Sequence, residues 1–324
     1  MKGLVYIPRD IAREGKEYLT ERGYGLRLGE PGVTEEQMMR DVVGCDAMLL
    51  RTVKATRRVL EAGDSLQIVA RHGVGLDIID VAAATELGIQ VTNTPSSNAE
   101  SVAEYVFCGL LAAARNLAPM SAAVREGNFF LRDRLKGREL FGKTLGLVGL
   151  GHIGLGVARI AALGFGMKVI AYRHNLRGKP LPDYIRLVEW EELFSAADVV
   201  SVHIPLRPEN IGLIGEREFA WMKPEAYFVN TARGKVVQEA ALLAALRDRR
   251  IAGAVLDVFA SEPPAPDNPL FALDNVVPTP HIGGATYEAM TRSAVYAAME
   301  IDRVLSGQEP QWPVNRPAAP RRKP

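Results

Sequence analysis

Short apolar runs alternate with amphipathic segments along almost the whole chain. A first series of strand-like runs lies in the N-terminal part, at GLVYI (3–7), DAMLL (46–50), QIVA (67–70) and IQVTN (89–93). A second series begins at TLGLVGLG and has its runs at residues 144–151, 168–172, 198–205, 226–232, 252–259 and 275–281. Strands separated by helix-length amphipathic segments are typical of βαβ units. The pattern therefore predicts an α/β chain with two parallel sheets.

Helical patterns stand on both sides of the second series. The first covers residues 99–115, and the second, YEAMTRSAVYAAMEIDRVLSG at 287–307, follows the last strand with no strand of its own to accompany. Residues 125–143 are charged and irregular, and their composition assigns them no role. The tail at 316–324 is rich in proline and basic residues, so we expect it to be disordered.

The composition indicates two domains and a small ligand. The chain has 324 residues, 48% of them apolar, which suits two domains of roughly 150 residues each. Its 39 basic and 38 acidic residues nearly cancel, which disfavours nucleic acid or an anionic membrane as the main partner. Cys45 and Cys108 are too few for a disulfide framework and lack metal-ligand spacing, and the longest uncharged stretch, 144–158, is too short to span a membrane. We expect a soluble, cytoplasmic protein without a metal site.

A glycine-rich loop follows the first strand of the second series. Gly149, Gly151 and Gly154 have GxGxxG spacing between an apolar strand and a helical pattern. In this order the glycines permit a tight turn, a close approach of the backbone to a pyrophosphate, and close helix packing. The backbone N–H groups of His152 and Ile153 would face the anion at the helix N-terminus. An ordinary glycine-rich turn is the alternative, but the flanking strand and helix favour dinucleotide binding.

The strand VIAY is followed by Arg173, 19 residues after Gly154, where an Asp or Glu usually binds the adenosine ribose. A guanidinium cannot accept the hydroxyl hydrogen bonds, but it suits a 2′-phosphate, and His174 could add a donor. The sequence therefore favours NADP over NAD. In the alternative, Arg173 stacks on the adenine and the protein uses NAD.

His281 is the best acid–base candidate among the five histidines. Hydride transfer to a carbonyl leaves an oxygen that must gain a proton, and histidine is the usual donor. His281 follows a strand in PTPHIGGAT, a position that faces a cleft at the carboxyl edge of a sheet. Glu262 could bond to the far ring nitrogen and fix the tautomer, although a Glu before two prolines can also be a solvated turn residue.

Two further strand ends carry charged residues. Arg233, in FVNTARGKVV, could hold a carboxylate and polarise the neighbouring carbonyl, or it could be a loop charge without a role. Asp257, at the end of GAVLD, could hold the nicotinamide carboxamide; a hydrogen bond at the strand end is the alternative.

The motifs HGVGLDIIDV, NTPSSNAESVAE, LVGLGHIG, FVNTARG, LDVFASEPP and PTPHIGGAT occur in the order and spacing of one family. From about residue 40 to Asn315 the chain resembles the D-isomer-specific 2-hydroxyacid dehydrogenases. The resemblance implies two doubly wound parallel-sheet domains. A flavodoxin-like substrate domain would comprise residues 1–97 and 287–315, and a Rossmann dinucleotide-binding domain residues 98–286. It also implies a homodimer.

The resemblance assigns roles to individual residues. It implies that His281 is the acid–base, Glu262 its carboxylate partner and Arg233 the substrate clamp. The backbone N–H groups of Val74 and Gly75 would bind the substrate carboxylate, and His72 would form a wall of that site. The remaining residues would contact the cofactor, with His203, Ile204 and Pro205 on the adenine side and Thr231, Ala232, Asp257 and Gly284 on the nicotinamide side.

The expected reaction is hydride transfer between NAD(P)H and C2 of a small 2-oxo or D-2-hydroxy acid, with glyoxylate or hydroxypyruvate reduction foremost. The resemblance to D-3-phosphoglycerate dehydrogenases is the first alternative, because Arg51 and Lys54 resemble a segment that approaches substrate phosphate; a solvated helix start is their other interpretation. A dinucleotide-sensing corepressor is the alternative of another class. Arg207 and Asn210 depart from the usual family residues and, like Arg173, favour NADP.

Overall fold

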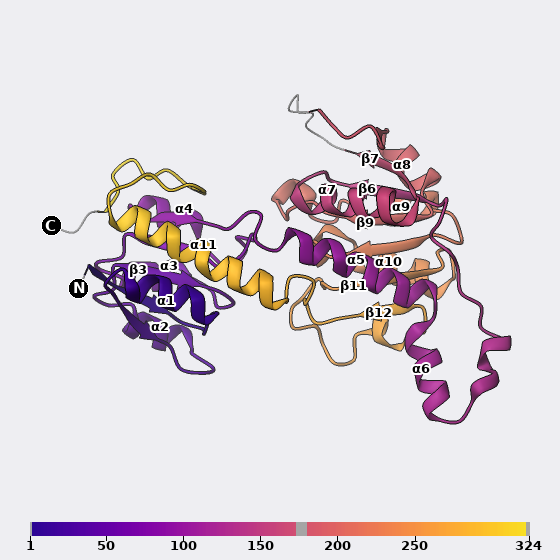
Figure 1. Ribbon diagram of the computed structural model, residues 1–324, viewed down its shortest axis with the longest axis horizontal. Coiled ribbons are helices and arrows are strands. Elements are labelled where there is room, and N and C mark those ends of the chain that lie inside the picture. Colours follow the sequence, from indigo (N-terminus) through magenta and orange to yellow (C-terminus); the bar gives the residue numbers. More distant parts are fainter. Residues whose placement is uncertain (1, 173–179, 322–324) are drawn as a thin grey trace. The chain divides into compact units, whose positions relative to one another are not determined.

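The computed structural model describes residues 2–172 and 180–321 (Figure 1). It divides into two compact units, which we call the terminal unit, Met1–Asn98 with Ala285–Pro324, and the central unit, Ala99–Gly284. These bounds lie within two residues of the expected domain junctions near residues 97 and 286. Arg173 and His174, the residues that favour NADP, lie outside the described residues.

The terminal unit is a five-stranded, fully parallel sheet in the order β2-β1-β3-β4-β5. Its strands are β1 (Gly3–Ile7), β2 (Tyr24–Leu28), β3 (Ala47–Leu50), β4 (Ile68–Arg71) and β5 (Gln90–Thr92). This is the flavodoxin-like order, so the predicted doubly wound architecture is confirmed. Alternate residues along each strand face opposite layers: Met48 and Leu50 pack under the helices at 35–41, 57–62 and 81–86, whereas Ala47 and Leu49 pack under those at 13–21 and 287–305.

The helices of the terminal unit are α1 (Arg13–Glu21), α2 (Glu35–Asp41), α3 (Arg57–Ala62), α4 (Val81–Glu86) and α11 (Tyr287–Leu305). Helix α11 is the predicted late helix, and Thr286 caps its N-terminus by accepting the N–H of Ala289. It packs so closely on α1 that a side chain at Gly15 would lie 2.7 Å from the Ala294 methyl group. The C-terminal part of the chain therefore completes the fold that the N-terminal part begins.

Residues 316–321 differ from the disorder expected for the tail, and Asn315 directly before them is also held in place. Asn315 accepts the Val91 N–H at 2.6 Å, and the N–H of Arg321 donates to the Gly88 carbonyl at 2.8 Å. Pro317 is buried. The proline-rich composition gave no sign of these contacts, because they depend on partners more than 200 positions away in the sequence.

The central unit is a seven-stranded parallel sheet in the order β12-β11-β10-β9-β6-β7-β8. Its strands are β6 (Thr144–Val148), β7 (Lys168–Tyr172), β8 (Ile185–Leu187), β9 (Val199–Val202), β10 (Tyr227–Asn230), β11 (Gly253–Leu256) and β12 (Val276–Pro278). From β8 to β11 the order is that of a Rossmann fold, with β12 added at one edge. The predicted dinucleotide-binding fold is thus confirmed.

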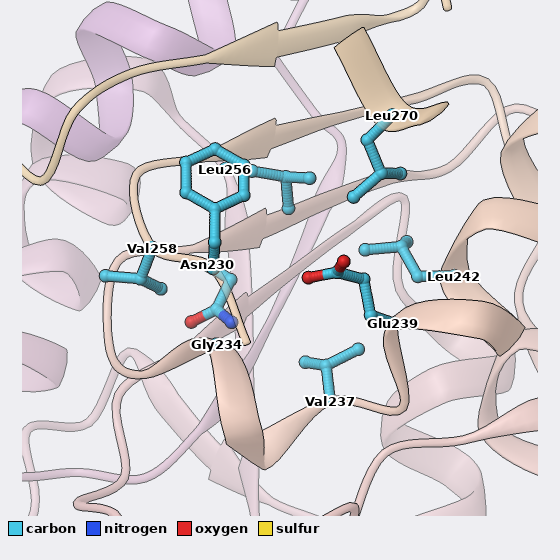
Figure 2. Close-up of a pocket in the computed structure, with 9 residues that line it drawn as sticks. Asn230, Gly234, Val237, Glu239, Leu242, Leu256, Val258 and Leu270 are labelled. Carbon is cyan, nitrogen blue, oxygen red and sulfur yellow. The ribbon is translucent and has the colours of Figure 1, made fainter. Parts of the chain in front are cut away.

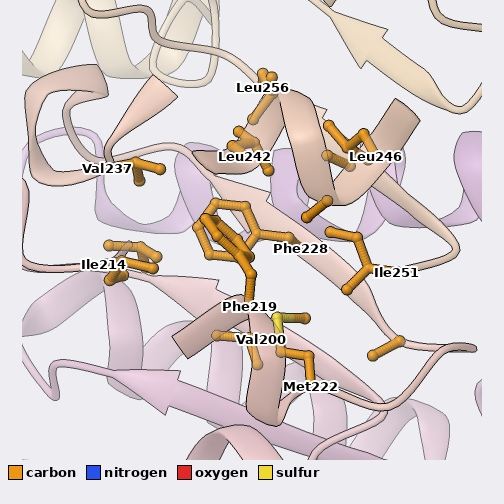
Figure 3. Packing of buried hydrophobic residues seen from close by; sticks show 14 of the residues in the cluster. Val200, Ile214, Phe219, Met222, Phe228, Val237, Leu242, Leu246, Ile251 and Leu256 are labelled. Carbon is orange, nitrogen blue, oxygen red and sulfur yellow. The ribbon is translucent and has the colours of Figure 1, made fainter. Parts of the chain in front are cut away.

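Helices cover both faces of this sheet. They are α5 (Ala99–Ala114), α6 (Leu117–Arg125), α7 (His152–Arg159), α8 (Trp190–Ala196), α9 (Glu216–Trp221) and α10 (Glu239–Arg247), with short helical turns at Phe129–Asp133, Ile160–Gly164, Pro208–Asn210, Gly234–Val236 and Pro269–Ala272. Helices α5 and α7 share one core with Val199 and Val255, and α8, α9 and α10 share the other with Val200 and Phe228. Figure 3 shows Phe219 of α9 against Phe228 of β10, with ring centroids 5.2 Å apart.

Residues 125–143, which the pattern left without an element, continue α6 into a short helical turn at Phe129–Asp133. In the described part of the chain no single helix is long and apolar enough to cross a membrane; α5 and α6 qualify as a pair only by length and composition, across a 58° bend. Much of α5 is buried in the core of the central unit.

Candidate active site

The glycine loop joins β6 to α7 and leaves room for a ligand at one glycine. Gly149 has a φ of 102°, and a side chain there would lie 2.8 Å from the His203 carbonyl oxygen. A side chain at Gly154 would overlap the Gly149 carbonyl. At Gly151, in contrast, a side chain would meet no protein atom within 4 Å. The loop therefore fits a dinucleotide, because it is closed toward the fold and open at the position that must approach the pyrophosphate.

The helix begins at His152, whose side chain is exposed, and Ile153 is half-buried. Both contribute N–H groups to the first turn of α7, as expected for an anion site. The loop after β9 forms the neighbouring wall, with the Ile204 side chain against Gly149 and Pro205 exposed. The pKa of His203 is lowered to about 3 by burial, and its Nε2 lies 2.9 Å from the Ser201 hydroxyl. The lowered pKa indicates a neutral His203 ring at this edge.

The segment after β10 carries Thr231, Ala232 and Arg233. Asn230, which is 1% exposed, accepts the Ala232 N–H at 3.0 Å and donates to the Arg233 carbonyl at 3.1 Å, so its side chain shapes the turn. The Thr231 hydroxyl is buried without a hydrogen-bond partner among the described residues. An unpartnered hydroxyl at the carboxyl end of a central strand suits a polar group of a bound cofactor.

Gly234 brings this segment onto the loop that carries Glu262. A side chain at Gly234 would overlap the Phe259 carbonyl carbon and oxygen. Only glycine permits this contact between the two backbones, which places the Arg233 segment directly beside residues 259–260. Arg233 donates from Nη1 to the Ala232 carbonyl at 2.7 Å, and its charge is one of those that act on Glu262.

Glu262 and His281 form a hydrogen-bonded pair in the central unit. Nδ1 of His281 lies 2.8 Å from Oε2 of Glu262, and Oε1 accepts the Phe259 N–H at 3.2 Å. Partial burial opposes ionisation of Glu262, but the His281 hydrogen bond, the Phe259 N–H and the Arg233 charge hold its pKa below the ordinary value. The carboxylate thus fixes Nδ1 and leaves Nε2 of His281 as the nitrogen available for proton transfer.

Asp257 holds the turn that presents His281. It is 1% exposed and accepts the N–H groups of Ile282 and Gly283 at 2.8 and 2.7 Å, and the Thr279 hydroxyl at 2.8 Å. The half-buried Gly284 follows directly. These contacts favour the strand-end hydrogen bond over a nicotinamide contact as the role of Asp257. Tyr105, which hydrogen-bonds to Thr279 and which sequence reasoning missed, supports the same turn from α5.

In the terminal unit, the loop after β4 turns its carbonyl groups into the protein. The Gly73 carbonyl accepts the Thr94 N–H at 3.0 Å, the Val74 carbonyl accepts Asn93 Nδ2 at 3.0 Å, and the Gly75 carbonyl accepts Arg71 Nε at 2.8 Å. Within the described residues, the N–H groups of Val74 and Gly75 donate to no protein acceptor. Paired N–H groups of this kind form an anion-binding concavity, as the candidate carboxylate site requires.

His72 precedes this loop and is 4% exposed. Its pKa is lowered to about 4, chiefly by burial and further by the charges of Arg51 and Arg71. Nε2 lies 3.2 Å from the Met290 carbonyl of α11, to which the neutral ring donates. This supports a wall rather than a proton donor. Three residues hold this loop by hydrogen bonds to its carbonyl groups: Arg71, Asn93 and Thr94. They were not identified from the sequence, because no local pattern marks a residue that binds carbonyl groups.

No metal site accompanies these residues: between residues 2 and 172 and between 180 and 321, no group of three or more His, Cys, Asp or Glu side chains is arranged to hold a metal ion.

Comparison with known sequences identifies the relatives of the chain. Residues 107–283 match the NAD-binding domain of the D-isomer-specific 2-hydroxyacid dehydrogenase family. A D-3-phosphoglycerate dehydrogenase of Archaeoglobus fulgidus is 40% identical over 98% of this chain, which spans 60% of that protein. A glyoxylate reductase of Korarchaeum cryptofilum is 39% identical over 98% of this chain and 97% of its own length. A hydroxypyruvate reductase of Thermotoga maritima is 41% identical over 93% and 98% of the two chains.

Solved structures with a similar fold also superpose on nearly the whole chain. A protein of Thermus thermophilus superposes with a TM-score of 0.88, at 37% identity, over 96% of this chain and all of its own. An NADPH-dependent glyoxylate/hydroxypyruvate reductase of Sinorhizobium meliloti, solved with NADP and malonate, has a TM-score of 0.85 at 28% identity, over the full length of both chains.

Proposed function

Because the chain belongs to the D-isomer-specific 2-hydroxyacid dehydrogenase family, we propose that it transfers a hydride between NAD(P)H and C2 of a small 2-oxo or D-2-hydroxy acid, foremost as a glyoxylate or hydroxypyruvate reductase. The observation that carries this proposal is the 2.8 Å bond between Glu262 and His281, with Arg233 in the neighbouring segment. A histidine paired with a carboxylate beside a guanidinium suits reduction of a carbonyl next to a carboxylate.

The site residues share the tasks of the proposed reaction. The bound nicotinamide supplies or accepts the hydride. The Val74 and Gly75 N–H groups bind the substrate carboxylate, and the Arg233 guanidinium orients the acid and polarises its carbonyl oxygen. In reduction, protonated His281 gives its Nε2 proton to that oxygen; in oxidation, the neutral ring takes the proton back. Glu262 stabilises the charged ring and fixes its orientation throughout.

We propose NADP as the preferred cofactor. Arg173 stands where a carboxylate would reject a 2′-phosphate, and structural relatives are named as NADPH-dependent or were solved with NADPH. Of the two added donors, Asn210 already donates to the Pro205 carbonyl at 2.9 Å, whereas Arg207 is exposed beside Glu209.

Initial rates of glyoxylate and hydroxypyruvate reduction with NADPH and NADH, on wild type and Arg173→Asp, test the function and the cofactor together. We expect a preference for NADPH that the substitution reverses by at least about tenfold, because a carboxylate repels the 2′-phosphate. A wild-type preference for NADH would contradict the NADP proposal alone. An absence of turnover with either cofactor would favour phosphorylated acids and then the sensor alternative.

A phosphorylated 2-hydroxy acid is the second candidate substrate, favoured by two arginines of the terminal unit. Arg9 follows β1 and Arg51 follows β3, the adjacent strands at which the sheet order reverses, where doubly wound folds bind ligands. Burial lowers the pKa of Arg51; the Asp10 charge opposes this shift, and the charge of Arg9 adds to it. Nε of Arg9 is buried without a hydrogen-bond partner among the described residues. Two like charges held together favour a second anionic group on the ligand.

The Arg51→Gln variant distinguishes the two substrates. If the arginine pair binds phosphate, the variant raises KM for phosphohydroxypyruvate by about tenfold or more and leaves KM for hydroxypyruvate within about twofold. Equal effects on both acids would remove the reason for the phosphorylated substrate.

We propose a homodimer as the assembly. The α6 segment, defined here as residues 117–133, carries an apolar surface that a second copy can cover symmetrically. Its large apolar side chains are strongly exposed: Leu117 62%, Val124 61%, Phe129 55% and Phe130 71%. The variant Phe130→Asp should shift the mass measured by light scattering from dimer to monomer. Phe141→Asp, which changes an exposed phenylalanine outside this segment, should remain dimeric. A monomeric wild type would contradict the proposal.

A further inference from the structure

One carboxylate joins the segment that carries Arg233 to the loop that carries Glu262. Glu239 is the first residue of α10, six positions after Arg233. Its Oε2 accepts the Ala260 N–H at 3.1 Å, and its Oε1 accepts Asn268 Nδ2 at 3.1 Å. Ala260 and Asn268 stand on either side of Glu262 in the sequence. Glu239 therefore anchors the loop 259–268 at both ends.

The orientation of Asn268 is fixed from its other side. Its Oδ1 accepts the Leu270 N–H at 3.0 Å and caps the helical turn Pro269–Ala272. The amide therefore cannot reverse without loss of this bond, and Nδ2 must face Glu239. Because the donor at position 268 is fixed, the side chain at 239 must supply an acceptor.

Glu239 lines two cavities, a small one on the side of the Arg233 segment and one of about 220 Å³ beside Ala240, Leu243 and Asn268. Figure 2 shows Glu239 reaching from the start of α10 among side chains that are mostly apolar. The small cavity has a volume of about 10 Å³ and is lined by Asn230, Gly234, Val237, Glu239, Leu242, Leu256, Val258, Phe259 and Leu270. That volume is at the lower limit for one water molecule. Both oxygens of the Glu239 carboxylate accept hydrogen bonds from the protein, so its contacts point to a structural role toward the Glu262 loop.

We propose that Glu239 is a positioning residue that holds the loop 259–268 so that Glu262 faces His281. The proposal rests on the proposed dehydrogenase function. Glu239 itself contacts neither residue of the pair; it acts through Ala260, which directly follows the Phe259 N–H donor to Glu262. A loosened loop would lower the rate of proton transfer and leave the binding of the acid and the dinucleotide nearly unchanged.

Exchanging the partners of one hydrogen bond tests this role. In Glu239→Gln the introduced amide can accept the Ala260 N–H, but its NH2 group then faces the NH2 group of Asn268. In Asn268→Asp two carboxylates face each other. The double variant E239Q/N268D restores both bonds, since the introduced glutamine donates to the introduced aspartate, whose second oxygen still accepts the Leu270 N–H.

Glu216→Gln is the matched control. Glu216 is the first residue of α9, as Glu239 is of α10, and it is exposed. The control therefore removes the same charge from the same position of a helix, including its effect on the helix dipole, without touching the loop.

We would measure kcat and KM for hydroxypyruvate reduction, and hydrogen exchange in peptides covering residues 257–268. Each single variant should lower kcat about ten- to hundredfold, with KM within about twofold, and should speed exchange in the loop. The double variant should recover kcat to within about threefold of wild type, and E216Q should behave as wild type.

Two results would overturn the proposal. One is a Glu239→Gln variant that matches E216Q in kcat or in loop exchange; the other is a double variant that recovers neither. If wild type turns over no acid tested, the dehydrogenase function fails. In that case exchange in the loop still decides whether Glu239 anchors it.

Discussion

His281 adopts a backbone conformation that a histidine rarely takes. Its φ is 55°, in the left-handed region, which costs a residue with a side chain about 1 kcal/mol or more. The hydrogen bonds from Ile282 and Gly283 to Asp257 hold the chain in this turn. The conformation directs Nδ1 toward Glu262, so local strain accompanies the placement of the candidate acid–base.

Replacement of His281 by Asn separates chemistry from stability. Asparagine tolerates the left-handed region, so the melting temperature should stay equal or rise. The variant has no proton donor of suitable acidity, so kcat should fall by about a hundredfold or more, with cofactor Kd within about twofold. Thermal unfolding, steady-state kinetics and cofactor titration check these outcomes. An unchanged kcat would refute the acid–base role.

Arg233 and His281 could be named from the sequence because polar residues at strand ends of a parallel sheet meet at one edge. Their neighbours could not. The need for glycine at position 234 depends on the Phe259 backbone, and the role of Glu239 depends on Ala260 and Asn268, contacts that only folding creates.

At the scale of elements, the strand–loop–helix at β6 and α7 distinguishes glycines that serve the fold from one that serves the ligand. A side chain at Gly154 would collide with the Gly149 carbonyl, whereas Gly151 has open space and a φ of −81° that any residue can adopt. The motif therefore contains a glycine that the fold requires, Gly154, and a glycine that the bound ligand requires, Gly151.

Alanine substitution should separate the two requirements. We expect Gly151→Ala to unfold within about 1 °C of wild type but to raise the dinucleotide Kd about tenfold or more, because the methyl group occupies space that the pyrophosphate needs. Gly154→Ala should instead lower the melting temperature. Calorimetric unfolding and fluorescence titration measure both. Wild-type cofactor affinity in Gly151→Ala would contradict the assignment of this loop.

Strands with strong apolar runs were predicted and two weak ones were missed. β2 (Tyr24–Leu28) and β8 (Ile185–Leu187) are both edge strands, with partly or fully exposed residues and an arginine in each. An edge strand packs fewer neighbours, so its sequence carries less of the apolar signal on which strand prediction depends.

At the scale of the whole molecule, two histidines whose pKa is lowered link stability to pH. The pKa of His72 is lowered to about 4 and that of His203 to about 3, in both cases chiefly by burial. Below about pH 6.5 the unfolded chain takes up protons that the folded protein does not, so stability is lost as pH falls from about 6.5 toward 4. The stability contributed by the two neutral histidines is fully present above about pH 6.5.

The variant His72→Gln should weaken this dependence while it keeps a donor for the Met290 carbonyl. Between pH 7 and 4.5 wild type should lose about 2 to 3 kcal/mol more unfolding free energy than the variant. Urea unfolding at the two pH values measures the difference. His152→Gln, which changes an exposed histidine, should retain the wild-type dependence, and an equal loss in all three proteins would show that His72 does not contribute.

The sequence by itself determined the two α/β series, the glycine loop and the charged residues at strand ends, because hydrophobic period and backbone freedom are local properties of the chain. The tertiary structure decided which groups meet. It placed Asn315 against β5, directed Asp257 to the His281 turn rather than to the nicotinamide, and turned the Gly73–Gly75 carbonyls inward. These contacts join residues far apart in sequence, and their geometry is set by packing that no local pattern encodes.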